Sequence, residues 1–515
     1  MTRPPAHVHA PTQTHRRPGL ALALICIAQL MIVLDATVMN VALPSIREDL
    51  GFSAVGLTWV ITAYSLTFGG LLLFGGRTGD LYGRRRMFTV GVGLFAFASL
   101  LGGIAQSEAT LIIARALQGV GGAIAAPTAL ALIATTFREG DERNRAFGLY
   151  AAMAASGGAV GLLLGGILTD VASWRWALFI NVPIGLVVVL LAPRVLGDSR
   201  GSGNRLDVPG AVTITAGMMS LVYGLTNAAT HAWTDTATIV SLAAAAVLVI
   251  AFVFIELRSS APLLPFRILA NRNRSGAYLT MLGLAAALFA VFFFTSQYLQ
   301  VVEGWGPLLT GLGFLPMPLT IMFMSMVVVR RVAIRFGVRP LLLAGPALVV
   351  VSMLVLRTLD VSSGYPGILA GLMPLALGMG CVFVPLTMTA VAGVAPNETG
   401  LASALLNTGQ QLGGAVGLAV LGTAAAHAAS SRAEELAAGA GAGMSSEAIA
   451  HDIFVHGQSA AFTGGVALAG FAFLASLVLV RNAATPKAEP VLPQGDRALT
   501  DPDGDEAVAP IAIEA

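Results

Sequence analysis

The chain has 515 residues, of which 56% are hydrophobic and only 11% are charged. Since roughly a quarter of the residues of a soluble domain are charged, this composition excludes an ordinary soluble protein. A net charge of +2 likewise argues against a nucleic-acid partner, which would require a strongly basic surface.

Fourteen apolar runs follow one another along the chain, each close to the 20 or so residues that a membrane-spanning helix needs. They cover approximately residues 19–43, 57–76, 87–106, 109–134, 146–169, 174–195, 208–228, 238–257, 276–300, 309–329, 340–358, 366–392, 402–426 and 460–480. The first run is too long for a signal-peptide core and no cleavage site follows it, so it is predicted to remain as a span. The predicted fold class is therefore an all-α membrane protein.

The basic residues gather in every second loop, beginning with Arg84, Arg85 and Arg86. If both termini are cytoplasmic, 24 of the 29 basic residues lie on the cytoplasmic side, four lie outside and Arg115 lies within a span. Positively charged loops stay in the cytoplasm, so this asymmetry predicts that orientation. With an Arg-, Ala- and Gly-rich composition, we expect a bacterial inner-membrane protein.

Three short sequences recur in order at nearly one offset, which indicates an internal duplication. The letters GGAVGL occupy both 157–162 and 413–418, the Tyr82-Gly83 turn is echoed by Phe336-Gly337, and Gly119-Val120-Gly121 is echoed by Gly378-Met379-Gly380. Duplicated halves around a central site are usual in secondary transporters. The predicted parts are a cytoplasmic tail (1–18), a six-helix bundle (19–195), a linker (196–207), an inserted helix pair (208–257), a second linker (258–275), a second six-helix bundle (276–480, with an outer loop of helical tendency at 427–459) and a polar cytoplasmic tail (481–515).

The loop between the second and third spans carries a candidate gate made of Gly76, Asp80, Gly83, Arg84 and Arg85. An acid at a helix end beside a glycine turn can accept hydrogen bonds from a neighbouring helix and pair with Arg84. Such a contact would hold one cytoplasm-closed arrangement. The simpler interpretation is a tight turn whose arginines only fix the orientation.

Several of these segments resemble signatures of the major facilitator superfamily. The loop 76–86, the segment LIIARALQGVGGA at 111–123 and the glycine series of span five match that pattern. Residues 34–44 (LDATVMNVALP), the Trp174–Pro183 segment and Gly400–Asn407 are similar to the fourteen-span drug:proton antiporters of the EmrB/QacA type. The resemblance, over roughly residues 20–480, implies two six-helix bundles plus two inserted helices.

Two positions differ from the family pattern. Leu162 follows Gly161 where the family usually has proline, and Ile334 occupies the position that matches Asp80. The resemblance implies that Gly157, Gly161, Gly165 and Gly166 form the antiporter motif. Small residues at this spacing let two helices approach closely.

Asp35 and Arg115 are the charged residues well inside the predicted hydrocarbon layer. Asp35 lies roughly 12 Å and Arg115 roughly 9 Å from the outer ends of their spans, so the two can pair if their helices are neighbours. Burial raises the proton affinity of a carboxylate and a guanidinium lowers it. We therefore expect Asp35 to carry the coupling proton, with Arg115 tuning it and Gln118 sharing the network; the alternative is a purely structural ion pair.

Five further amide side chains within spans are candidates for the wall of a substrate cavity. They are Asn181, Gln297, Asn407, Gln410 and Gln411. Hydrogen bonding between helices is an equally good explanation of these amides. Phe292, Phe293 and Phe294 are a weaker candidate for an apolar pocket and would otherwise face lipid.

Taken together, these features predict a proton-coupled antiporter that exports amphipathic drugs or antibiotics by alternating access. The only lysine, Lys487, lies between Pro486 and Ala488, so no phosphate-binding loop with Gly-Lys-Ser/Thr exists. The histidines lack zinc spacing, so no metal site or enzyme is expected. We expect no cofactor, the proton gradient as energy source, and a monomer whose partners are substrate, protons and lipid. The alternatives are a proton symporter or facilitator that imports a nutrient, and a receptor or scaffold without transport.

Overall fold

The computed structural model describes residues 18–137, 141–197, 207–231, 233–259, 262–264, 266–394, 399–440 and 443–481. Within these ranges every regular element is a helix, which confirms the all-α prediction. Nearly all of the two predicted tails (1–17 and 482–515) and most of the 196–207 linker lie outside the described residues.

The first half contains seven helices, and two inserted helices follow it. Their bounds are α1 Pro18–Leu50, α2 Ala54–Tyr82, α3 Arg84–Gly103, α4 Glu108–Thr136, α5 Asp141–Val171, α6 Trp176–Phe179, α7 Asn181–Val195, α8 Val208–Thr230 and α9 Thr236–Arg258. The second half comprises α10 Phe266–Leu269, α11 Arg272–Val301, α12 Pro307–Phe314, α13 Pro316–Phe323, the π-helix η1 Met324–Val328, α14 Val329–Phe336, α15 Arg339–Leu356, α16 Gly364–Val391, α17 Thr399–Glu435, the π-helix η2 Leu436–Ala440 and α18 Ser446–Leu479.

Every predicted span coincides with helix. Among the described residues, thirteen helical stretches are long and apolar enough to cross a membrane. The remaining predicted span, 146–169, lies within the 31-residue helix α5. The count of about fourteen spans is therefore confirmed.

Two predicted spans are interrupted rather than continuous. Span six is split at Ile180 into α6 and α7, and Pro183 removes the backbone N–H that would have bridged the break. Span ten is split between α12 and α13 at Leu315, where Pro316 and Pro318 remove two more donors, and it then passes through η1.

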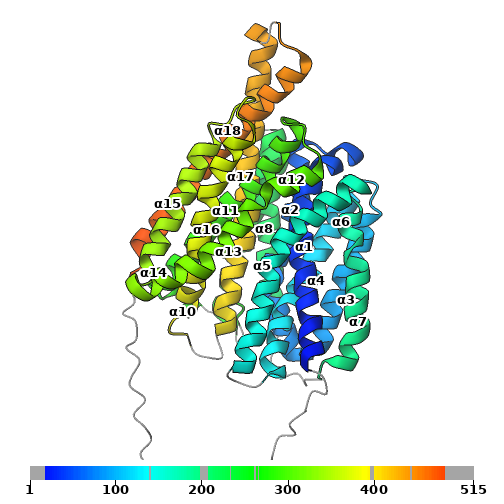
Figure 1. Ribbon diagram of the computed structural model, residues 1–515, viewed down its shortest axis with the longest axis vertical. Coiled ribbons are helices and arrows are strands. Elements are labelled where there is room, and N and C mark those ends of the chain that lie inside the picture. Colours follow the sequence, from blue (N-terminus) through cyan, green and yellow to red (C-terminus); the bar gives the residue numbers. More distant parts are fainter. Residues whose placement is uncertain are drawn as a thin grey trace, which may run out of the picture. The chain divides into compact units, whose positions relative to one another are not determined.

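The segment predicted as an outer loop, 427–459, is mostly helical. Helix α17 continues to Glu435 and α18 begins at Ser446, so the two spans extend into a helical hairpin. The Arg432 guanidinium ties the hairpin together, because it bonds Asp452 at 2.6 Å and Glu435 at 3.0 Å. In Figure 1 this hairpin projects past the other helices at the top of the view.

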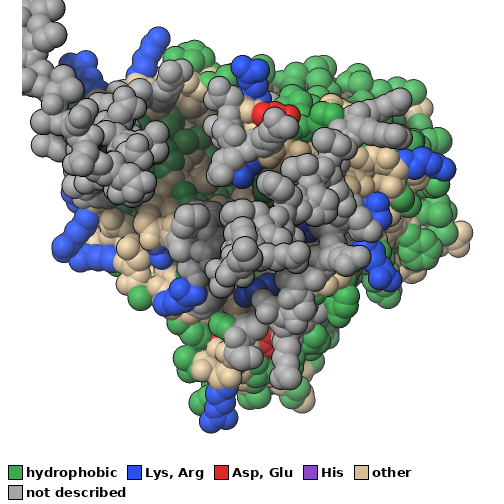
Figure 2. All heavy atoms as spheres, turned by 90° about the horizontal axis from the view of Figure 1, so that it is seen from below, with side chains coloured by type: hydrophobic (Ala, Val, Ile, Leu, Met, Phe, Trp, Pro, Cys, Tyr) green, Lys and Arg blue, Asp and Glu red, His purple; other side chains and the backbone are tan. Residues whose placement is uncertain are grey.

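We call the end of the bundle that carries this extension the hairpin end. The opposite end, toward which α1 begins and α18 finishes in Figure 1, is called the terminal end. Figure 2 shows the terminal end, where Lys and Arg side chains surround the visible part of the face and acidic side chains are few.

The two halves repeat the same packing pattern. Helix α5 packs on α1 in the first half, and α17 packs on α11 in the second. The repeated letters GGAVGL lie in these two equivalent helices. In α17, a side chain on Gly413 would collide with the Leu282 carbonyl of α11. The sequence repeat therefore corresponds to a repeated close contact between helices.

Among the described residues, the halves meet mainly where α2 packs on α17 and where α5 packs on α12, with a smaller contact of α1 with α11. The α1–α11 contact lies toward the hairpin end, where Ser296 Oγ donates to the Asn40 carbonyl at 2.8 Å and Gln300 Nε2 donates to the Val41 carbonyl at 3.0 Å. Helix α8 packs against both α2 and α17, so the inserted pair lies along one of the two symmetry-related seams.

Candidate functional site

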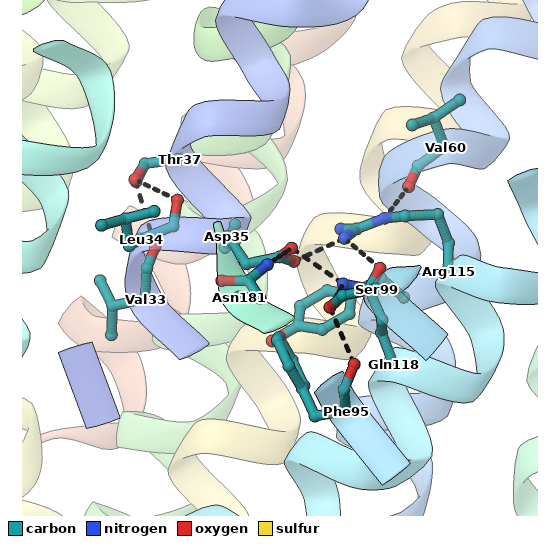
Figure 3. Close-up of polar contacts among 12 residues, drawn as sticks. Val33, Leu34, Asp35, Thr37, Val60, Phe95, Ser99, Arg115, Gln118 and Asn181 are labelled. Carbon is teal, nitrogen blue, oxygen red and sulfur yellow. Dashed lines mark hydrogen bonds and ion pairs between the residues drawn. The ribbon is translucent and has the colours of Figure 1, made fainter. Parts of the chain in front are cut away.

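An ion pair lies inside the first half. Asp35 comes from the middle of α1 and Arg115 from the first third of α4, and their side chains are 0% and 1% exposed. Arg115 Nη1 lies 2.5 Å from Asp35 Oδ2 (Figure 3). A lone charge at this depth would be costly, whereas a pair with satisfied hydrogen bonds can be retained.

Both carboxylate oxygens of Asp35 accept hydrogen bonds. Oδ1 accepts from Gln118 Nε2 at 2.9 Å and from Asn181 Nδ2 at 2.8 Å, while Oδ2 faces Arg115. Gln118 also accepts from Arg115 Nη1 at 2.8 Å and donates to Ser99 Oγ at 2.7 Å. Helices α1, α3, α4 and α7 thus share one buried polar network.

Arg115 is fixed by α2 as well as by Asp35. Its Nε donates to the Val60 carbonyl at 2.9 Å, and its guanidinium lies 4.5 Å from the centre of the Tyr64 ring. A cation over an aromatic face is stabilised by the electron density of the ring. Since arginine stays charged, Arg115 contributes a permanent positive charge to this cluster.

The structure brings Asp35, Arg115 and Gln118 together, as the sequence pattern anticipated, and it adds Asn181. Among the described residues, no hydrogen bond links the other amides predicted for a cavity to this network. Gln297 is buried on α11, and on α17 Asn407 is exposed while Gln410 and Gln411 are half-buried. Gln411 lies against Gly69 of α2, at the seam between the halves.

The gate loop is described in part. Gly83 adopts φ 95° and ψ 128° between α2 and α3, a left-handed conformation that favours glycine. Its repeat partner Gly337 also has positive φ, at 77°. Arg85 donates to the carbonyls of Pro193 and Leu196 at 3.3 Å, so it binds the end of α7. Arg84 begins α3.

Asp80 and Gly76 belong to the last two turns of α2. The Asp80 side chain lies outside the described residues, as does that of Ile334 in the second half. The predicted Asp80–Arg84 latch therefore stays a prediction. A side chain on Gly76 would make ordinary contact with Pro127 of α4 at 3.4 Å.

The glycines of span five form two distinct contacts. Gly157, Gly161 and Gly165 face Val33, Thr37 and Val38 of α1, and a Cβ on Gly165 would lie 2.9 Å from the Val38 Cα atom. Gly166 faces the other half: its Cβ would lie 2.7 Å from the Leu308 Cα atom and 2.8 Å from the Pro307 carbonyl oxygen.

The sequence did not single out Ser99 or the Val60 carbonyl. A single serine in an apolar helix is common, and a backbone carbonyl leaves no mark in the sequence at all. Asn181 was recognised as a polar residue of a span, but its position beside Asp35 depends on the packing of α7 against α1.

No group of three or more His, Cys, Asp or Glu side chains within the described ranges is arranged to hold a metal ion. Cys26 and Cys381 are free thiols, and both are buried.

Comparison with known proteins gives a consistent result. The sequence profile of the Major Facilitator Superfamily matches residues 25–418. The chain is 44% identical to the puromycin resistance protein pur8 of Streptomyces alboniger over 409 residues, covering 78% of this chain and 80% of that protein. It is 42% identical to the cephamycin export protein CmcT of Amycolatopsis lactamdurans over 422 residues, covering 81% and 87%.

Solved structures share the fold. A bacterial homologue of the human lysosomal transporter Spinster, in an inward-facing and unoccupied conformation, superposes with a TM-score of 0.61. The match covers 91% of this chain and 99% of that one at 16% sequence identity, so it bears on the fold alone.

Proposed function

Because this chain belongs to the major facilitator superfamily and is a membrane transporter rather than an enzyme, we propose that it exports amphipathic small molecules in exchange for protons. The names of its relatives support the direction of transport, since two of them are an antibiotic resistance protein and an antibiotic export protein. Small amphipathic compounds of neutral or singly positive charge are the proposed cargo, because no acid lies in the interior of the predicted spans nine to fourteen.

The observation that carries the proposal is the fully buried Asp35, held by one permanent cation and two amides. While Asp35 is ionised the pair is neutral, and when it takes up a proton Arg115 is left with an uncompensated charge. Any helix movement that changes the distance between α1 and α4 therefore changes the free energy of protonation. That dependence is what couples proton movement to a conformational change.

Alternating access supplies the conformational change in this proposal. The halves would separate at the hairpin end, which requires breaking the Ser296 and Gln300 hydrogen bonds to α1 and the Gly166 contact with α12. The gate loop around Asp80, Gly83 and Arg84 would act at the opposite, terminal end.

In this proposal the protein is a monomer in the inner membrane of a bacterial cell, and its terminal end lies in the cytoplasm. The arginine-rich segments 84–86 and 330–339 support this orientation, because positively charged segments between spans remain cytoplasmic.

The experiment uses everted membrane vesicles that carry wild type, Asp35→Asn or the control Asp360→Asn, in which an exposed loop carboxyl is replaced. Uptake of puromycin and of ethidium, an amphipathic monocation, is measured with and without a pH gradient and a protonophore. We expect gradient-driven uptake in wild type and Asp360→Asn, abolished by the protonophore. Asp35→Asn should lose it while still exchanging labelled for unlabelled substrate, which needs no net proton movement.

Full gradient-driven uptake by Asp35→Asn would refute the assignment of the proton site. Movement of substrate in the same direction as protons would support the symport alternative.

A further inference from the structure

The amide of Asn181 has one bonded and one unbonded end. Its Nδ2 donates to Asp35 Oδ1 at 2.8 Å, while its Oδ1 is buried and has no hydrogen-bond partner within the described structure. The residue is 0% exposed. An unpartnered carbonyl oxygen inside a protein is costly, so its presence beside a group that exchanges protons requires an explanation.

We infer that Asn181 is a positioning residue that follows the protonation state of Asp35: its amide donates to the carboxylate and turns to accept from the protonated acid. The inference rests on the proposed function, because it assumes that Asp35 takes up and releases a proton.

The observed orientation of the amide is the one that an ionised Asp35 requires. A carboxylate has only acceptors, so the NH₂ end must face it. The opposite orientation would set the Asn181 oxygen against the Asp35 oxygen, leaving two acceptors in contact.

Protonation reverses this requirement. A proton from solvent forms an O–H bond at Oδ1 of Asp35, since Oδ2 faces the guanidinium, and the charge of the Asp35–Arg115 pair changes from zero to +1. The new O–H is a donor and needs an acceptor. Gln118 Oε1 already accepts from Arg115, and the Ser99 hydroxyl already accepts from Gln118 and donates to the Phe95 carbonyl. The Asn181 oxygen is the acceptor beside Asp35 that has no donor.

In the described part of the chain, no other Asp, Glu or His side chain bonds to Asp35 or to its partners Arg115, Gln118 and Asn181. The charged or titratable groups that face it are Arg115 from α4 and Tyr64 from α2. Helix α3 contributes Ser99, and α5, packed on another face of α1, contributes glycines.

Because of the place of Asn181 in the chain, the rotation of its amide can affect the helices around it. It is the first residue of α7, directly after the break at Ile180, and α7 packs on both α1 and α3. A change in its hydrogen bonding therefore acts where two helix segments meet. In the middle of an unbroken helix, the same change in hydrogen bonding would move the neighbouring helix segments relative to each other less easily.

The test is pH-difference infrared spectroscopy of the full-length protein in vesicles of defined phospholipid, with the asparagine side chains labelled with ¹³C. The variants are wild type, Asp35→Asn, Asn181→Leu and Asn181→Thr, and the control is Asn227→Ala, which alters an amide on α8 bonded to Asp235 and Thr238. In wild type and control, acidification should produce the C=O band of a protonated carboxyl together with a shift of one asparagine amide band. Asp35→Asn should lose both signals.

Both Asn181 variants should keep the carboxyl band and lose the amide shift. If one of the two variants fails to insert into the membrane, the other still provides the test. If the amide shift persists in them, or if wild type shows the carboxyl band without the shift, the inference is overturned while Asp35 remains the proton site. If no Asp35-dependent carboxyl band appears in wild type, the proposed function and the inference both fail.

Discussion

The contact of Gly166 with α12 offers a direct test of how the two halves separate. Replacing Gly166 with alanine sets a Cβ atom 2.7 Å from the Leu308 Cα atom, whereas ordinary contacts begin at 3.4 Å. The backbones of α5 and α12 must therefore move apart by about 0.7 Å. Overpacking of this kind costs about 1–3 kcal/mol. Because the strain exists only while the halves touch, the variant should favour the state that is open at the hairpin end by about 5- to 150-fold.

Two other glycines of α5 provide matched controls. A Cβ on Gly158 would meet nothing within 4 Å, so Gly158→Ala reports only the gain in helix propensity, about 1 kcal/mol at most. A Cβ on Gly165 would lie 2.9 Å from Val38 Cα, which belongs to the same half. Gly165→Ala should therefore lower the melting temperature without shifting the equilibrium between the two states.

The assay is labelling of Thr169→Cys by a membrane-impermeant maleimide in protein lacking Cys26 and Cys381. Thr169 lies on the same face of α5 as Gly166, is 9% exposed, and has a hydroxyl without a partner, so its replacement breaks no hydrogen bond. Labelling should be faster with Gly166→Ala than with Gly158→Ala or Gly165→Ala. Equal rates in all three would refute the idea that the α5–α12 contact holds the halves together.

Further substitutions test the polar network and two contacts near the hairpin end. Arg115→Gln leaves Asp35 buried without its cation and should destabilise the protein by about 3–5 kcal/mol in thermal unfolding, with most of the loss recovered when Asp35→Asn is added; a single variant as stable as wild type would contradict this. Ser99→Ala removes one hydrogen bond of the network and should lower the stability of the protein by about 0.5–1.5 kcal/mol. Unchanged stability would contradict a contribution of this bond. Gln300→Leu removes a bond between the halves and should speed the maleimide labelling described above, and unchanged labelling would argue against that bond as a latch. Hydrogen bonds from Ser362 hold the pKa of Asp360 below its usual value. The stabilisation by this carboxyl is therefore present above the ordinary Asp pKa of about 3.9 and is lost as the pH falls. The melting temperatures of wild type and Asp360→Ala should converge in acid, and a difference that stays constant with pH would contradict this.

Much of the bundle could be predicted from the sequence, because membrane-spanning helices are marked by long apolar runs. The predicted spans coincide with helices, and the duplicated GGAVGL letters lie at equivalent helix contacts. The breaks at Ile180 and Leu315 were missed. A proline does not always interrupt a helix, and the apolar run continues through both sites.

The candidate site was predictable to the extent that it involves charge. Asp35 and Arg115 stand out because a charge inside an apolar span is rare, and their similar depths made pairing plausible. The uncharged members were harder to assign. Asn181 was predicted to line a cavity, and only the packing of α7 on α1 sets its amide 2.8 Å from Asp35. Its role, like those of Asp35, Arg115 and Gln118, stays a prediction until the variants are measured.

The inserted pair α8–α9 breaks the two-fold symmetry of the bundle. It packs along the α2–α17 seam, and its main contacts in the described part of the chain do not include α5 or α12 at the equivalent seam on the other side. Under the proposed function, once the α5–α12 contact opens, a compound dissolved in the bilayer could approach the halves on that side without meeting the inserted pair. In that case the membrane leaflet would supply the cargo, and the solubility of a compound in lipid would affect its uptake as much as its shape.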